Sequence, residues 1–133
     1  VSMVPSCLFT PISIVPSCLY TEPEIASVGL TETQAREKGV QIRVGRYDMK
    51  GNGQQIISRE TGGFIKVIFA ANSDVLLGAQ IMCARATDMI GELATALANG
   101  LTPTQLMYAM RAHPTFNEAI SCAVENSRDN IKE

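Results

Sequence analysis

The sequence contains one histidine in 133 residues, no run of basic residues and no long apolar run. A membrane-spanning helix needs roughly 18 consecutive apolar residues, so no membrane partner is expected. The formal net charge is −2, which excludes the basic surface that nucleic acids and anionic membranes attract. The N-terminus lacks the basic region of a signal peptide. The sequence therefore predicts a soluble, cytoplasmic protein without nucleic-acid or membrane partners.

Close cysteine pairs are also missing. The four cysteines are scattered along the chain, with neither a Cys-x-x-Cys pair nor neighbouring histidines that would indicate zinc. We therefore expect no metal site. The cysteines are interpreted as reduced thiols, most of which fill space in the core. They are Cys7, Cys18, Cys83 and Cys122.

The length and the apolar content of 46% suit one domain with a real core. Residues 4–10 (VPSCLFT) recur almost unchanged as residues 15–21 (VPSCLYT), with no third copy. The first copy is either an extra strand or a duplicate left by cloning or sequence assembly. Because the sequence also starts without methionine, we expect a piece of a longer protein. The predicted division is an extension at 1–12, a domain at 13–127 and a tail at 128–133.

The order of the predicted elements indicates an α+β fold. Apolar, β-rich runs at 64–71 and 75–83 flank Asn72-Ser73-Asp74, which predicts a hairpin of central strands. The expected architecture is an antiparallel sheet of about four to five strands with helices packed on one face. Its other predicted elements are strands near 15–21, 25–30 and 40–47 and helices at 31–39, 88–99, 102–110 and 117–125.

Gly51-Asn52-Gly53 invites comparison with a phosphate-binding loop. The cluster lacks the Gly-x-Gly-x-x-Gly spacing, and the pattern predicts no helix directly after it. We therefore interpret it as a bend or loop.

His113 is the only side chain whose ordinary pKa makes it a proton carrier near neutral pH. Glu118 follows five residues later and can orient an imidazole if the chain turns back between them. Pro114 favours such a turn. The alternative is a purely structural histidine, because lone histidines are more often structural than catalytic.

Thr115 and Glu118 also fit the spacing of a capping box at the start of a helix. A carboxylate that reaches back to Thr115 is not fully available to His113. We expect the contact with His113 to prevail and Thr115 to cap the helix through its own hydroxyl.

Two stretches together resemble a known family. The first is IVPSCLYTEPEIASVGLTE at residues 14–32, and the second is His113-Pro114-Thr115-x-x-Glu118. Their order and separation resemble the C-terminal dimerisation domain of the pyridine nucleotide-disulfide oxidoreductases, over about residues 13–127. The resemblance is closest to the dihydrolipoyl dehydrogenase branch. Glutathione reductase, mercuric reductase and soluble transhydrogenase share the domain.

The resemblance implies a catalytic role for both members of the pair. In the family this domain joins two subunits as a homodimer, and its histidine exchanges protons with a dithiol in the partner subunit's active site. The glutamate hydrogen-bonds the other ring nitrogen, and the His-Pro bond is cis. His113 and Glu118 occupy these positions. A base of near-neutral pKa suits this step because the thiolate is the reacting form of the dithiol.

The family's cofactor motifs are missing. Members bind FAD through a Gly-x-Gly-x-x-Gly turn, carry a Cys-x4-Cys redox pair and bind NAD(P) in a further domain; this sequence has neither motif. The resemblance thus implies FAD and NAD(P) for a full-length parent, with no cofactor-binding residues and no activity in this chain alone. The alternatives are the equivalent domain of another family member, or a non-catalytic α+β binding module with a deep pocket away from His113.

Overall fold

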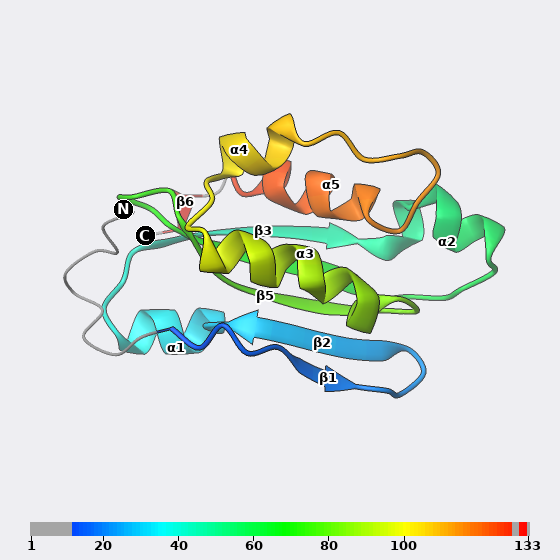
Figure 1. Cartoon of the computed structure of the whole chain (residues 1–133), viewed down its shortest axis with the longest axis horizontal. Helices are drawn as coiled ribbons and strands as arrows, with labels where there is room; N and C mark the ends of the chain where they lie inside the picture. Colours follow the sequence, from blue (N-terminus) through cyan, green and yellow to red (C-terminus); the bar gives the residue numbers. More distant parts are fainter. Residues whose placement is uncertain (1–11, 129–130, 133) are drawn as a thin grey trace.

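A six-stranded antiparallel sheet forms the middle of the molecule, with strand order β1-β2-β5-β4-β3-β6 (Figure 1). The computed structural model describes residues 12–128 and 131–132, so the first copy of the repeat, residues 4–10, and all but the last residue of the predicted extension at 1–12 lie outside the described residues. Within the predicted tail, residues 131–132 pair with β3. The strands are β1 (Ser17–Leu19), β2 (Glu24–Gly29), β3 (Ile42–Asp48), β4 (Phe64–Ala70), β5 (Leu76–Cys83) and β6 (Ile131–Lys132).

The centre of the sheet is the hairpin of β4 and β5, as the two apolar runs predict. Their register places Ile65 opposite Ile81 and Val67 opposite Ala79, and all four side chains are buried. In the connection, Asp74 adopts a positive φ of 60°, which aspartate tolerates in turns. The α+β class and the hairpin are confirmed.

Three helices cover one face of the sheet, where the larger core lies (Figure 1). Side chains from alternate positions of β4 and β5 meet the apolar side of α3, including Leu93 and Leu97. The covering helices are α3 (Ala86–Ala98), α4 (Pro103–Tyr108) and α5 (Glu118–Asn126).

Helix α1 (Glu32–Glu37) lies against the other face, which differs from the expectation that helices pack on one face. Its Ala35 is buried in a second, smaller cluster with Ile42, Ile68 and Leu77. The reason lies in the topology, because the chain from β2 to β3 must pass β5 and β4 to reach the other side of the sheet. It does so across the face that α3–α5 leave uncovered.

Two capping boxes form as the sequence predicts. Thr31 with Gln34 starts α1, and Thr102 with Gln105 starts α4, with Pro103 in the first turn. Helix α4 ends at Tyr108, two residues before the predicted end at Met110. Within the described residues, no helix combines the length and the apolar character needed to cross a membrane.

The interpretation of Gly51-Asn52-Gly53 as a bend without a following helix was wrong. A short 3-10 turn, η1 (Met49–Gly51), leads directly into α2 (Gly53–Ile57). Asn52 caps α2, because its Oδ1 accepts a hydrogen bond from the backbone N–H of Gln55 at 3.0 Å. The helix is only five residues long, and its start depends on this cap rather than on an apolar period.

Candidate active site

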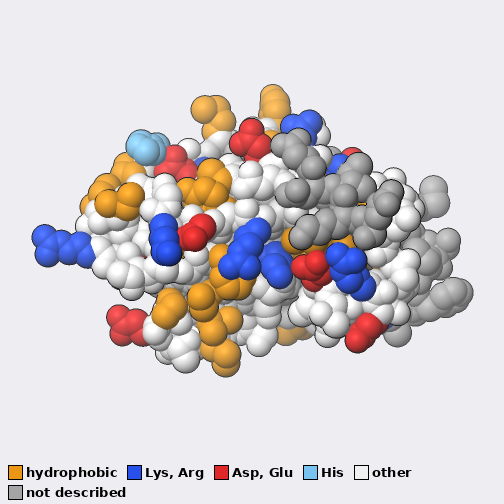
Figure 2. Space-filling model, turned by 180° about the vertical axis from the view of Figure 1, so that it is seen from behind, with side chains coloured by type: hydrophobic (Ala, Val, Ile, Leu, Met, Phe, Trp, Pro, Cys, Tyr) orange, Lys and Arg blue, Asp and Glu red, His pale blue; other side chains and the backbone are white. Residues whose placement is uncertain are grey.

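His113 lies in the loop between α4 and α5. Its side chain is 78% exposed. The bond between His113 and Pro114 is cis, as the family resemblance implies. On the face that Figure 2 shows, acidic and basic side chains are interspersed rather than grouped by sign. Because its side chain is 78% exposed, the imidazole lies at the surface of the chain and is not packed in its core.

Glu118 is the first residue of α5, and its carboxylate contacts the imidazole. Nδ1 of His113 lies 2.9 Å from Oε1 and 3.1 Å from Oε2 of Glu118. An ionised carboxylate can only accept hydrogen bonds, so Nδ1 must carry the hydrogen. In the neutral imidazole the lone pair is then on Nε2, the nitrogen that can receive a proton.

The same carboxylate also binds Thr115, so the expectation that Glu118 cannot serve both Thr115 and His113 was wrong. Oε2 of Glu118 accepts a hydrogen bond from the backbone N–H of Thr115 at 2.9 Å while the carboxylate holds His113. The Thr115 hydroxyl does not cap α5, because it donates to the carbonyl of Ala112 at 2.7 Å. The residue before the helix, Asn117, makes no side-chain capping bond. Two carboxylate oxygens are enough to serve both donors.

The pKa of Glu118 is lowered from its ordinary value, first by the hydrogen bond from the Thr115 backbone and then by the one from His113. Its place in the first turn of a helix also favours the charged form. The carboxylate is therefore ionised at neutral pH and available to fix the imidazole.

This lowered pKa predicts a pH effect. Because the pKa is lower in the folded chain than the unperturbed value of 4.5, the ionised carboxylate stabilises the fold above that value. The contribution is lost as the pH falls through the lowered pKa. Carboxyl NMR should give a titration midpoint for Glu118 below 4.5. A His113→Ala variant should still titrate below it, since the Thr115 contact is the larger cause; a midpoint at or above 4.5 in the unmodified chain would contradict this account.

The middle of the loop is attached to the α2 region. Nδ2 of Asn52 donates a hydrogen bond to the carbonyl of Thr115 at 3.0 Å. A Cβ added to Gly53 would lie 3.9 Å from Cε1 of His113, so the start of α2 is next to the imidazole. The residues first considered as a phosphate loop therefore support the histidine loop.

Both ends of the loop are attached to α3. Glu92 of α3 accepts hydrogen bonds from Arg111 and from Asn117, which stand before and after the histidine. The side chain of Arg111 is only 7% exposed. Sequence reasoning missed these three residues and Asn52, because their contacts join positions far apart in the chain. The one local signal was the asparagine between two glycines, which is typical of a helix cap.

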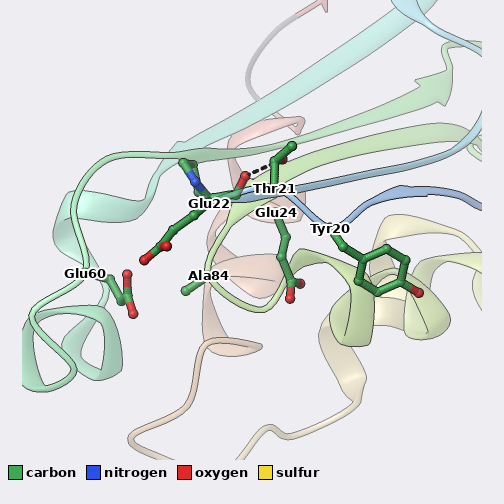
Figure 3. Close-up of a pocket in the computed structure, with 7 residues that line it drawn as sticks. Tyr20, Thr21, Glu22, Glu24, Glu60 and Ala84 are labelled. Atoms are coloured by element: carbon green, nitrogen blue, oxygen red, sulfur yellow. Dashed lines mark hydrogen bonds between the residues drawn. The ribbon is translucent and has the colours of Figure 1, made fainter.

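A hollow of about 310 Å³ lies away from His113, at the start of β2 (Figure 3). Three of its lining side chains are carboxylates, those of Glu22, Glu24 and Glu60. Oε2 of Glu24 is already occupied by the backbone N–H and hydroxyl of Thr87, at 2.9 and 2.7 Å. Among the described residues no group of histidine, cysteine, aspartate or glutamate side chains is arranged to hold a metal ion.

Comparison with known families identifies the domain. The family model described as "Pyridine nucleotide-disulphide oxidoreductase, dimerisation domain" matches residues 15–124. The chain belongs to this family. The resemblance in the two sequence stretches is therefore confirmed, and the alternative of an unrelated binding module, which needed that resemblance to be a coincidence, is set aside.

Named relatives of this dimerisation domain include dihydrolipoyl dehydrogenases. That of Bacillus subtilis (strain 168) is 41% identical over 104 residues, 78% of this chain and 22% of the relative. That of Rhizobium etli is 42% identical over 102 residues, 77% of this chain and 21% of the relative. The chain thus spans only about a fifth of the length of these relatives.

Solved structures show the same fold. The HOCl-induced flavoprotein disulfide reductase RclA from Escherichia coli matches with a TM-score of 0.80 and 27% identity, over 84% of this chain and 26% of that one. LpdA from Mycobacterium tuberculosis matches with a TM-score of 0.81 at 23% identity, over 87% of this chain and 25% of that one. The second match concerns the fold alone.

Proposed function

We propose that this chain is the dimerisation domain of a cytoplasmic, dihydrolipoyl dehydrogenase-like disulfide oxidoreductase, and that His113 and Glu118 serve as an acid/base pair in the active site of a second subunit. One observation carries the proposal. Glu118 holds Nδ1 of an imidazole that is 78% exposed, which leaves Nε2 as the proton acceptor of an exposed ring.

The proton chemistry follows from this arrangement. A dithiol reacts through its thiolate, so its proton must be removed before disulfide exchange and returned afterwards. Nε2 of His113 receives the proton, and the resulting imidazolium is stabilised by the carboxylate of Glu118 at 2.9 Å. Glu118 also keeps the ring in the tautomer that can accept.

Electron transfer requires groups that this chain does not bind. The family depends on FAD and NAD(P), and the present sequence has no Gly-x-Gly-x-x-Gly turn or Cys-x4-Cys pair to hold a flavin or to carry a disulfide. We propose that other domains of the intact protein hold FAD and NAD(P), which supply the hydride and electron transfer. The isolated chain is then expected to have no oxidoreductase activity.

The variant Glu118→Gln tests the proposal in the intact oxidoreductase. The Thr115 N–H requires an acceptor, so the oxygen of the introduced amide faces Thr115 and its NH2 group faces Nδ1 of His113. The neutral ring must then carry its hydrogen on Nε2, which removes the proton acceptor. We expect kcat for dithiol oxidation to fall by about a hundredfold.

Glu125→Gln is the matched control, because it makes the same chemical change on the exposed side of α5. We expect it to leave kcat unchanged. If Glu118→Gln also leaves kcat unchanged while the enzyme retains its flavin and its dimeric state, the acid/base role is wrong.

A further inference from the structure

An ion pair between Arg111 and Glu92 spans the base of the loop that carries His113. We propose that Arg111, Glu92 and Asn117 form a clamp that fixes residues 111 and 117 against α3, and so determines where the His113–Glu118 pair stands. This inference rests on the proposed function and adds positioning residues to it.

Glu92 is the centre of the clamp because its two carboxylate oxygens bind opposite ends of the loop. Oε1 accepts hydrogen bonds from Nε of Arg111, at 3.0 Å, and from Nη2 of the same side chain. Oε2 accepts one from Nδ2 of Asn117 at 2.9 Å. One side chain on α3 thus joins the residue two positions before His113 to the residue directly before Glu118.

The guanidinium of Arg111 extends the clamp to both neighbouring helices. Its Nη1 donates to the carbonyls of Leu106 in α4 at 3.3 Å and of Ala109 at 3.2 Å, and to Oγ of Ser121 in α5 at 2.7 Å. A planar guanidinium with five N–H donors can make such contacts in fixed directions, which a lysine ammonium cannot reproduce. The end of α4 and the start of α5 are therefore held in one arrangement.

The exposure of the imidazole explains why a clamp matters. The His113 side chain is 78% exposed, so packing within this chain does little to position it. Its place follows from the loop backbone and from Glu118, and the backbone is held by the clamp and by the bond from Asn52 to Thr115. A displacement of about 1 Å in a reacting group can reduce the rate by about a hundredfold.

The main test is Glu92→Gln in the intact oxidoreductase. The introduced amide has no charge and one oxygen in place of two, so it loses the ion pair with Arg111 and turns an NH2 group toward one of the two donors, Arg111 or Asn117. We expect kcat for dithiol oxidation to fall about tenfold or more with little change in KM. Reduction of an artificial quinone acceptor by the reduced nicotinamide, which bypasses the dithiol, should be unchanged.

Glu32→Gln is the matched control. Glu32 is also ion-paired, with Arg36 on α1, and its side chain is 28% exposed against 30% for Glu92. It should leave both reactions unchanged. If Glu92→Gln lowers the quinone reaction as much as the dithiol reaction, the ion pair between Arg111 and Glu92 only stabilises the fold, and the inference is overturned.

Combining Glu92→Gln with His113→Ala separates this inference from the proposed function. If the clamp acts through the imidazole, the double variant should be no slower than His113→Ala alone. A further, multiplicative loss in the double variant would overturn the clamp. Full activity of His113→Ala would instead contradict the proposed function.

Two measurements remain decisive if Glu92→Gln impairs folding of the intact enzyme. Arg111→Lys keeps the charge but not the forked contacts, and should lower the dithiol reaction selectively. In the 133-residue chain, carboxyl NMR of Glu92→Gln or of Arg111→Lys should show the titration midpoint of Glu118 rising toward 4.5. The reason is that the two donors to this carboxylate, on Thr115 and His113, are displaced when the clamp is broken. An unchanged midpoint together with an unchanged kcat in Arg111→Lys would reject the clamp.

Discussion

Replacing His113 with alanine is expected to lower kcat for dithiol oxidation by 10²–10⁴-fold in the intact oxidoreductase, the usual contribution of a positioned general acid or base. The reason is that the variant loses Nε2, which Glu118 keeps as the acceptor, and no other histidine of this chain can take its place. Steady-state kinetics with a dithiol substrate measure the effect. Since the side chain is 78% exposed, its loss should not disturb the fold.

Added imidazole provides the control for this variant. A free imidazole can occupy the space that the side chain leaves and carry the proton, so kcat should recover in part as imidazole is added. Reduction of the flavin by the nicotinamide should match that of the unmodified enzyme throughout. A variant that loses flavin reduction as well, or that imidazole does not restore, would indicate a structural histidine.

Replacing Gly45 with alanine should cause a large loss in the free energy of unfolding. A Cβ at this position of β3 would lie 1.9 Å from the carbonyl oxygen of Ala123 and 2.8 Å from the backbone nitrogen of Ser127. These backbone atoms cannot move unless α5 separates from the sheet. Overpacking of this kind costs about 1–3 kcal/mol and sometimes more, and we expect the upper end, about 3 kcal/mol. Denaturant unfolding of the chain measures the difference.

Gly91→Ala is the control for this prediction. Gly91 lies in the middle of α3, and an added Cβ would meet nothing within 4 Å. Alanine is the better helix former, so this variant should gain about 0.5–1 kcal/mol. If Gly45→Ala unfolds at the same denaturant concentration as the unmodified chain, β3 and α5 do not pack as closely as described, and the placement of Glu118 is in question.

Features that depend on neighbouring residues could be predicted from the sequence. The capping boxes at Thr31 and Thr102 and the turn between β4 and β5 are each encoded within a few residues. The contact between His113 and Glu118 was also predicted, because a proline next to the histidine lets the chain turn back over five positions. Its catalytic role stays a prediction.

Features that depend on topology could not be predicted in this way. The position of α1 on the opposite face follows from the strand order, which no local pattern states. Arg111 and Glu92 stand 19 positions apart on different elements, and their pairing appears only once α3 and the loop are packed together. The link from Asn52 to Thr115 spans 63 positions. Local spacing therefore identified the His113–Glu118 pair but not the residues that hold its loop in place.

Mixing two inactive forms of the intact oxidoreductase tests the central proposal most directly. One form carries His113→Ala, and the other lacks its redox-active cysteines but keeps His113. If the histidine serves the partner subunit, each hybrid dimer has one complete active site, and random mixing should restore about a quarter of the full activity. If the mixture stays inactive although hybrid dimers are present, His113 does not act across the subunit interface.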